Sequence, residues 1–340
     1  MSINLKSELP KLLSLKRKAK IKDKVKHIMN AIEINKDMHS RYIYNELNQI
    51  LESDSLNRKY YYINRLIKSL TQFKKSKYND LNLNQWKKYD DIITDSLWII
   101  DKRDKTGEHS AKYWGNFIPQ IPNQLIRRFT KKNELVLDTF LGSGTTMIES
   151  IRLDRNCIGV ELNPEVIKKT EEIIKKEIKI NESKSVTKIV KGDSKTVSLD
   201  KHLEKFKKKT VQLVIMHPPY WDIIKFSKYK KDLSNTETIE HFLDDFGKII
   251  DNITHYLDSD RYLAVVIGDK YNKGEWIPIG FRVMNEVLKR NYKLKSVIVK
   301  NYEETSSKKG QENLWRYRAL VGGFYIFKHE YILLFQKIKN

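Results

Sequence analysis

The segment from Val211 to Trp221 carries the residues with the clearest chemistry. It reads V-Q-L-V-I-M-H-P-P-Y-W, an apolar run typical of a buried parallel strand, followed at once by a polar side chain, two prolines and two aromatic rings. Pro218 and Pro219 fix their φ angles, hold the preceding residue extended and leave nearby carbonyls free to accept hydrogen bonds. Tyr220 adds a ring that can stack. The pattern predicts a site for a flat base.

A second segment, from Leu135 to Thr146, predicts a loop that a ligand can approach closely. It reads L-V-L-D-T-F-L-G-S-G-T-T, an apolar strand that leads through a glycine-containing turn into a helix. Gly142 and Gly144 can take φ angles closed to other residues, and the start of the helix supplies free N–H groups. The spacing is neither that of a dinucleotide fingerprint nor that of a triphosphate loop.

A carboxylate follows the next expected strand. The strand runs from Cys157 to Val160 and ends in Glu161, after which Asn163 and Pro164 open a helix. In a doubly wound sheet, an acidic residue at the tip of the second strand is where ribose hydroxyls are held. Glu161 is therefore a candidate ligand-binding residue.

Together these segments closely resemble the amino-methyltransferases of DNA. In that family F-x-G-S-G-T-T is the S-adenosylmethionine loop and (Asp/Ser/Asn)-P-P-(Tyr/Phe/Trp) is the catalytic loop. The resemblance covers roughly Asp95 to the C-terminus, and its largest departure is His217, where the family usually carries Asp, Asn or Ser. Strands alternating with helices predict an α/β fold with a parallel sheet. The resemblance implies a Rossmann-like, seven-stranded methyltransferase sheet whose last strand is antiparallel.

The resemblance also implies S-adenosylmethionine as cofactor and a set of residues that bind it. Asp138 would lie near the amino group of the methionine moiety, Glu161 would hold the ribose hydroxyls, and Asp193 would meet the adenine amine, although a simple Gly-Asp turn is the alternative for Asp193. The segment from Tyr113 to Pro122 resembles the family's proline-rich turn over the methionine end. The full expected set is Pro119, Asp138, Phe140, Gly142, Gly144, Thr145, Glu161 and Asp193.

The catalytic residues expected from the resemblance are His217, Pro218, Pro219 and Tyr220. An exocyclic amine is a poor nucleophile because its lone pair is delocalised, and acceptors at its two hydrogens would make attack on the methyl group easier. A neutral ring nitrogen of His217 and the carbonyl of Pro218 could accept, while Tyr220 stacks on a flipped base. Imidazolium has no acceptor, so transfer should fail as the pH drops through the pKa of His217. Alternatively, His217 is a structural cap and the proline carbonyl acts alone.

Composition agrees with a protein that binds nucleic acid. The formal charge of +22 and the isoelectric point near 9.6 favour a polyanionic partner, which the resemblance implies is double-stranded DNA, although a general bias toward Lys, Asn and Ile would also explain them. Cys157 is the only cysteine and lies in a strand, which argues against the thiolate chemistry of methylation at cytosine C5. His329 has no second ligand at metal spacing, so no metal is expected.

Nothing in the sequence points to a membrane. No apolar run approaches the length of a membrane span, and the first residues, Met1 to Asn4, lack the apolar core of a signal peptide. We therefore expect a cytoplasmic protein.

Two domains are expected. Residues 1–94 form a basic helical region, interrupted by Pro10 and by a polar cluster between Glu52 and Asn57, that serves either DNA recognition or as a helical cap. Residues 95–340 form the methyltransferase domain. Its insertion 303–328 mixes basic and aromatic residues suited to DNA contact. The candidate DNA-binding residues are Trp221, Lys308, Lys309, Trp315, Arg316 and Arg318.

Three readings of function remain open at this point. The first is a site-specific DNA methyltransferase, with cytosine N4 preferred over adenine N6 because Tyr220-Trp221 completes a Pro-Pro-Tyr-Trp often seen in cytosine-N4 enzymes. Whether a cognate restriction endonuclease accompanies it is left open. The second is an RNA methyltransferase on the same fold, and the third is a nucleic-acid-binding protein with a degenerate, inactive methyltransferase domain.

Overall fold

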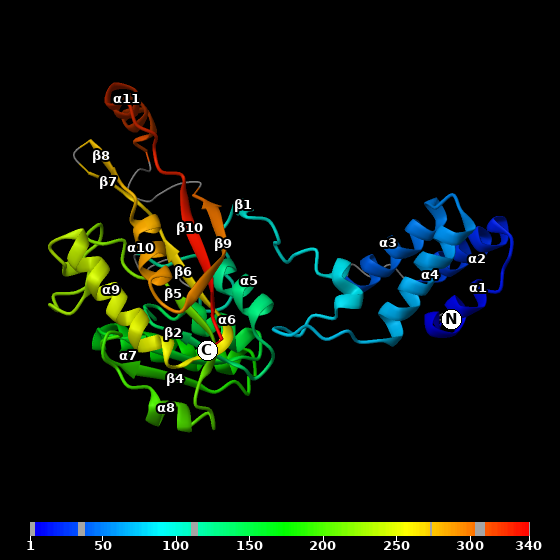
Figure 1. The fold of residues 1–340 in the computed structure, drawn as a ribbon. Coiled ribbons are helices and arrows are strands. Elements are labelled where there is room, and N and C mark those ends of the chain that lie inside the picture. Colours follow the sequence, from blue (N-terminus) through cyan, green and yellow to red (C-terminus); the bar gives the residue numbers. More distant parts are fainter. Residues whose placement is uncertain (1–3, 33–37, 110–114, 273, 303–309, 340) are drawn as a thin grey trace. The chain divides into compact units, whose positions relative to one another are not determined.

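The chain divides into two compact units, Met1–Ile92 and Ile93–Asn340 (Figure 1). The structure is a computed structural model that describes residues 4–32, 38–109, 115–272, 274–302 and 310–339.

The first unit is helical. Apolar residues at helical spacing, such as Ile21, Val25 and Ile28, are buried and build a core of its own. Lys59 is also fully buried, and its Nζ donates to the carbonyl of Ile50 at 2.6 Å, near the end of a neighbouring helix. The elements are α1 (Leu5–Leu12), α2 (Lys18–Ala31), α3 (Met38–Glu52), α4 (Leu56–Thr71) and the 3-10 helix η1 (Leu83–Lys88).

Pro10 does not interrupt the helical region as the sequence suggested. It lies inside α1, close to the end of that helix. Proline removes one backbone N–H from a helix interior and is normally unfavourable there. Leu9 and Leu12 on either side of it are fully buried, so packing against the core holds this turn in place. The polar cluster after Glu52 does separate α3 from α4, as expected.

The second unit is built on a mixed sheet that confirms the expected Rossmann-like fold. The strand order is β1-β9-β10-β6-β5-β2-β3-β4. Strand β10 runs antiparallel to both of its neighbours, β6 and β9, whereas the strands from β6 to β4 pair in parallel. The strands are β1 (Leu97–Trp98), β2 (Leu135–Asp138), β3 (Asn156–Glu161), β4 (Thr187–Lys191), β5 (Val211–Met216), β6 (Leu257–Ile267), β9 (Tyr292–Asn301) and β10 (His329–Lys337).

The sheet has one strand more than the seven expected. The additional strand, β1, lies at the start of the expected methyltransferase domain, and it pairs in parallel with β9 through Leu97 and Val299. Trp98 is buried, and its indole N–H donates to the carbonyl of Asp95 at 2.9 Å. A two-residue strand has no periodicity that sequence analysis could detect, and burial of one tryptophan is sufficient to fix it at the sheet edge.

Helices cover both faces of the sheet (Figure 1). On one face, α9 and α10 bury aromatic and branched side chains, including Phe242 and Phe246, against alternate strand residues. On the other, α5, α6 and α7 pack beside one another over β3, β4 and β5. The helices are α5 (Gln120–Phe129), α6 (Thr145–Arg152), α7 (Pro164–Ile180), α8 (Asp200–Glu204), α9 (Ile239–Thr254) and α10 (Ile279–Leu288). Among the described residues of the whole chain, no helix combines the length and apolar character that a membrane span requires.

Two further elements lie beyond the ends of β9 and β10 (Figure 1). They are the antiparallel hairpin of β7 (Lys270–Asn272) with β8 (Glu275–Ile277), and α11 (Glu312–Gly322) within the expected insertion. The ring of Tyr271 stacks on that of Phe324 at a centroid distance of 4.3 Å. Because α11 has no buried residue, much of its surface is available for contacts with a partner.

Candidate active site

The ends of four parallel strands lie level at one edge of the sheet. Asp138 at the end of β2 pairs with Gly159 of β3 and with Ile215 of β5, and Glu161 at the end of β3 pairs with Lys191 of β4. The loops that follow these strands therefore meet at the same edge, where open α/β sheets bind their ligands.

The glycine loop is held by the carboxylate of Glu161. One oxygen of Glu161 accepts the N–H of Gly142 at 2.9 Å and the other accepts the N–H of Asn163 at 2.8 Å. Gly142 and Gly144 have φ angles of +50° and +83°, and Gly144 caps α6. Because L side chains rarely adopt these angles, the predicted glycine positions are required by the backbone. Burial raises the pKa of Glu161 despite these two donors.

Asp138 is a buried carboxylate with one oxygen unsatisfied. Its Oδ1 accepts the N–H of Phe140 at 2.9 Å, while its buried Oδ2 makes no hydrogen bond of ordinary geometry among the described residues, although the nearby hydroxyl of Thr146 acts to lower the pKa. Burial raises the pKa of Asp138 to about 6. A buried acceptor without a partner is unfavourable, so this oxygen is suited to a ligand that brings an N–H donor or an ammonium group.

Asp193 lies in the turn after β4, one strand further from β5 than Glu161. Its Oδ1 accepts the N–H of Lys195 at 2.9 Å, and the Nζ of Lys195 lies 3.9 Å from its Oδ2. Lys195 makes a closer ion pair, at 2.6 Å, with Asp245. Asp193 thus lies in the Gly-Asp turn that was the alternative reading of this residue. Because the turn follows β4 at the ligand edge, binding of the cofactor's adenine by Asp193 stays a prediction.

The segment before α5 touches both predicted loops. Thr145, at the start of α6, donates from Oγ1 to Oδ1 of Asn116 at 2.6 Å. The ring of Phe117 packs edge-on against that of His217, with centroids 4.7 Å apart. Pro119 stands at the N-cap of α5, directly after this contact. The first part of the expected motif, including Tyr113 and Trp114, lies outside the described residues.

The loop after β5 is anchored to the beginning of β10. The hydroxyl of Tyr220 lies 3.1 Å from Nε2 of His217 and donates to Oε2 of Glu330 at 2.8 Å. A β-carbon at Gly268, just after β6, would lie 2.7 Å from Cε2 of Tyr220, so the tyrosine ring lies directly on that backbone. Stacking of Tyr220 on a base stays a prediction.

Sequence analysis missed a group of residues behind this loop. Tyr302 donates from its hydroxyl to Oε2 of Glu330 at 2.8 Å, and Nζ of Lys300 lies 3.3 Å from Oε1. Lys300 and Glu330 are buried and face each other across β9 and β10. The expected antiparallel direction of the last strand could have predicted this group. An antiparallel strand begins at the edge where the parallel strands end, so its first residues lie beside His217.

His217 is neutral over a wide range of pH. Desolvation lowers its pKa from an ordinary 6.5 to about 4, and the negative charge of Glu330 opposes only part of this change. Protonation of His217 is expected to stop methyl transfer. Because the pKa is about 4, this loss is expected near pH 4 and not at mildly acidic pH. Above that value one ring nitrogen of His217 carries a free lone pair.

The expected DNA-binding residues are found in two different environments. The indole of Trp221 donates to the carbonyl of Thr236 at 3.2 Å, and Nζ of Lys270 lies 4.4 Å from its ring centroid, so this residue is held in place. On α11, Arg316 and Arg318 are exposed, and the guanidinium of Arg318 lies 5.2 Å from the ring of Trp315. Lys308 and Lys309 lie outside the described residues.

Cys157 is buried within β3, and burial raises the pKa of its thiol. A thiol in that state is a poor nucleophile. The structure therefore agrees with the argument against methylation at cytosine C5.

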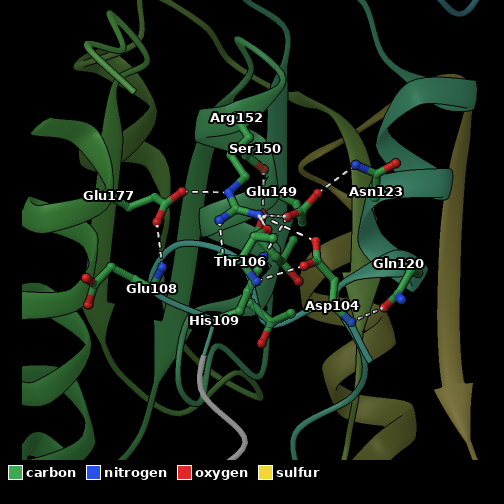
Figure 2. Close-up of polar contacts among 12 residues, drawn as sticks. Asp104, Thr106, Glu108, His109, Gln120, Asn123, Glu149, Ser150, Arg152 and Glu177 are labelled. Atoms are coloured by element: carbon green, nitrogen blue, oxygen red, sulfur yellow. Dashed lines mark hydrogen bonds and ion pairs between the residues drawn. The ribbon is translucent and has the colours of Figure 1, made fainter. Parts of the chain in front are cut away.

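A dense polar network fastens α6, which follows the glycine loop, to its surroundings (Figure 2). Arg152 bonds from Nε to Glu177 of α7 at 2.6 Å and from Nη2 to the carbonyl of Thr106 at 2.7 Å. Glu149 contacts Nε2 of His109 at 2.6 Å and accepts from Asn123 of α5 at 2.7 Å. The network ties the loop around residues 104–109 and two helices to α6, and so fixes the helix whose N-terminus faces the ligand edge.

Asp104, His109 and Glu149 are also the one group of described residues whose ligand atoms, all within 4.8 Å, could hold a metal ion. Sequence analysis did not anticipate this cluster. The guanidinium of Arg152 lies 3.7 Å from Asp104 and 3.3 Å from Glu149, so a positive charge already compensates the two carboxylates. We propose no metal here.

Comparison with known proteins agrees with this geometry. A model of the DNA methylase family matches residues 12–173 and 211–340, which include the glycine loop, Glu161 and the His217 loop. The chain belongs to the DNA methylase family. Residues 174–210 lie outside the match, and these include Asp193.

Named relatives of this DNA methylase are similar over short stretches. It is 35% identical over 89 residues to the Type II methyltransferase M.BglI of Bacillus subtilis, covering 26% of this chain and 24% of that protein. It is 29% identical over 138 residues to the Type II methyltransferase M.MjaII of Methanocaldococcus jannaschii, covering 38% of this chain and 23% of that protein. The chain thus spans about a quarter of the length of these relatives.

Among solved structures, TrmN from Thermus thermophilus is similar, with a TM-score of 0.41 and 13% identity over 65% of this chain and 49% of that one. The Rossmann-like fold of this chain follows from its own strand order.

We expect His217 to make the protein less stable as the pH falls from about 6.5 toward 4. In this window the unfolded chain protonates His217, whereas the folded chain, with the pKa lowered to about 4, does not. Protons therefore favour unfolding. In urea denaturation from pH 7.5 to 4.5, His217→Asn should lose less stability, or gain more, than the unsubstituted chain.

Asp138, whose pKa is raised to about 6, changes stability in the opposite direction, so only the difference between the two chains reports on His217. His255→Asn, at the exposed C-cap of α9, serves as the control for removal of a histidine. Identical pH dependence in the unsubstituted chain and His217→Asn would contradict a neutral, desolvated His217.

Proposed function

We propose that this DNA methylase transfers the methyl group of S-adenosylmethionine to the exocyclic amine of a base in double-stranded DNA. The observation that carries the proposal is that the glycine loop, Glu161 and the loop from His217 to Tyr220 open at one edge of the sheet. A methyl donor bound by the first two would be presented to a base held by the third.

The residues at this edge fit the cofactor. The unsatisfied Oδ2 of Asp138 suits the ammonium of the methionine moiety. Each oxygen of Glu161 has a lone pair beyond its single backbone donor and can accept from ribose hydroxyls. We assign Phe140, Gly142, Gly144, Thr145 and Pro119 to the methionine end of the cofactor, and Asp193 to its adenine.

The chemistry needs alignment more than activation. The sulfonium methyl is already reactive, so the protein must orient the amine in line with it and exclude water. A ring nitrogen of His217 and the carbonyl of Pro218 would accept the two amine hydrogens. Pro219 would stiffen the loop, and the ring of Tyr220 would stack on the base. In a duplex the target base must be flipped out to reach this site.

Cytosine N4 is the proposed target in preference to adenine N6. The support is the sequence Pro-Pro-Tyr-Trp from Pro218 to Trp221, which resembles the loop of cytosine-N4 enzymes. The named relatives are Type II methyltransferases. This supports a role as the site-specific modification enzyme of a restriction system, with a cognate restriction endonuclease as partner.

Both units carry groups suited to DNA. The first unit has twenty Lys and Arg residues against ten Asp and Glu. On α2, five lysines are exposed while Asp23 is the one acidic residue. In the second unit, α11 combines exposed Arg316 and Arg318 with Trp315. We assign phosphate contact to α2 and target recognition to α11. The exposed lysines of α2 are Lys18, Lys20, Lys22, Lys24 and Lys26.

Transfer of labelled methyl from S-adenosylmethionine tests the activity and the role of His217 together. Unmethylated genomic DNA should accept label, and His217→Ala should lower the rate by about 100-fold, the contribution typical of a positioned proton acceptor. Cofactor affinity should be unchanged in this variant. His202→Ala should keep full activity. Label in RNA alone would favour an RNA methyltransferase, and cofactor binding without transfer to either polymer would favour a non-catalytic protein.

Affinity for S-adenosylmethionine should depend on the ionisation of Asp138. The pKa of Asp138 is about 6 in the absence of a ligand, so at lower pH the carboxyl must lose a proton before it pairs with the ammonium. Calorimetric titration should therefore show affinity that weakens as the pH falls below about 6. Asp138→Asn should bind more weakly at pH 7.5 and lose this dependence. Equal affinity of the unsubstituted chain at pH 5 and pH 7 would contradict the assignment.

Neutralising lysines on α2 should weaken DNA binding in a way that depends on salt. Each lysine that contacts a phosphate contributes about 0.9 to the slope of log affinity against log salt. The triple substitution Lys20→Gln, Lys22→Gln, Lys24→Gln should lower both affinity and slope in an anisotropy titration. The matched control, Lys168→Gln, Lys169→Gln, Lys175→Gln, removes three exposed lysines from α7. Equal losses in the two triple variants would contradict a specific role for α2.

A further inference from the structure

The surroundings of His217 decide which of its ring nitrogens carries a proton. Nε2 lies 3.1 Å from the hydroxyl of Tyr220 and is, among the described residues, the one nitrogen of this ring with a hydrogen-bond partner. The side chain of His217 is partly exposed, so Nδ1 is the ring nitrogen left to meet a ligand. The hydrogen bond at Nε2 could run in either direction if His217 and Tyr220 were considered alone.

The direction is fixed by Glu330. The hydroxyl of Tyr220 has one proton, and it donates that proton to Oε2 of Glu330 at 2.8 Å. Glu330 is paired with Lys300 at 3.3 Å, and a carboxylate offers acceptors only. Burial, reinforced by the negative charge of Glu330, holds the pKa of Tyr220 well above its usual value, so the hydroxyl keeps its proton. The oxygen of Tyr220 must therefore accept from Nε2–H.

We propose that Glu330, acting through the hydroxyl of Tyr220, fixes neutral His217 as the Nε2–H tautomer and so leaves Nδ1 as the acceptor for the target amine. Glu330 is thus a positioning residue, and His217 is the residue that touches the substrate. The inference rests on the proposed methyl transfer and identifies how its unusual histidine performs the step.

The tautomer matters for the balance of the reaction. The amine nitrogen attacks the methyl carbon, the new C–N bond forms as the C–S bond breaks, and the electron pair of that bond passes to sulfur. The amine then releases one proton to Nδ1, which gives an imidazolium with both nitrogens protonated. Water takes this proton from Nδ1 before the next cycle. With the other tautomer, Nδ1 would present an N–H to the amine and could accept nothing.

The fold supplies Glu330 to this position by strand direction. Strand β10 is antiparallel to β6, so Glu330 at its beginning lies at the edge where β5 ends and His217 follows. Lys300 faces Glu330 across β9 and β10 and compensates its charge in a buried site. Removing the carboxylate would leave Lys300 and two tyrosine hydroxyls without their shared acceptor.

The test combines the protonation of His217 with the rate of methyl transfer. In the full chain labelled with ¹⁵N-histidine, His217→Asn identifies the signals of His217. The unsubstituted chain at pH 7.5 should show a protonated Nε2 and an unprotonated Nδ1. Tyr220→Phe removes the acceptor of Nε2–H and keeps the ring, so the signals should shift toward a mixture of tautomers. Its kcat should fall at least about tenfold, with the dissociation constant of S-adenosylmethionine unchanged.

Variants at Glu330 separate positioning from simple loss of structure. Glu330→Gln keeps an oxygen that accepts from Tyr220 and should preserve the Nε2–H tautomer, whereas Glu330→Leu should lose it together with most of the activity. Tyr292→Phe removes a buried hydroxyl, bonded to Thr254, elsewhere in the same unit. It should change neither the His217 signals nor the rate. Thermal denaturation of each variant identifies any that fail to fold.

The outcomes distinguish this inference from the proposed function. A protonated Nδ1 in the unsubstituted chain would overturn the inference whether or not the protein is active. A protonated Nε2 together with no transfer to any nucleic acid would contradict the proposed function and leave the tautomer assignment standing. Loss of activity in Glu330→Leu with unchanged His217 signals would show that Glu330 acts on the fold alone.

Discussion

The parallel pairing of β2 with β3 and β5 is the constraint on which the site depends. Because Asp138 stands level with Gly159 on one side and Ile215 on the other, strand pairing brings the glycine loop, Glu161 and His217 to one edge of the sheet. The buried strands that fix this register are almost wholly apolar, and their side chains are buried on both faces of the sheet. Ligand geometry is therefore secured by hydrophobic packing below the site.

Desolvation shifts the pKa values of two ionisable groups at the site. Burial raises the pKa of Asp138 and lowers that of His217, so desolvation favours the neutral form of each. A cationic methyl donor would restore the charge on Asp138. His217 can act without a charge, because neutral imidazole is the form that can accept a hydrogen bond from an amine. The same physical effect thus prepares one residue to bind a cation and the other to act as a neutral acceptor.

Much of this arrangement was predictable from the sequence. The alternation of strands and helices, the glycines at positive φ and the position of Glu161 all follow from local patterns whose physical requirements are strict. Strand β1, the hairpin β7–β8 and helix α11 were not predicted, because short or solvent-exposed elements lack apolar periodicity. The contact of Tyr220 with Glu330 joins residues far apart in the chain. It could have been anticipated only from the antiparallel direction of β10.

The central claim is that the loop from His217 to Tyr220 presents an exocyclic amine of a DNA base to a bound methyl donor. The most direct measurement is nucleoside analysis by mass spectrometry of DNA methylated by the purified protein. The account predicts N4-methylcytosine as the product, and N6-methyladenine would keep the amine chemistry while changing the base. Methylation at a ring carbon, such as C5 of cytosine, would contradict the account, because buried Cys157 cannot supply the nucleophile which that reaction requires.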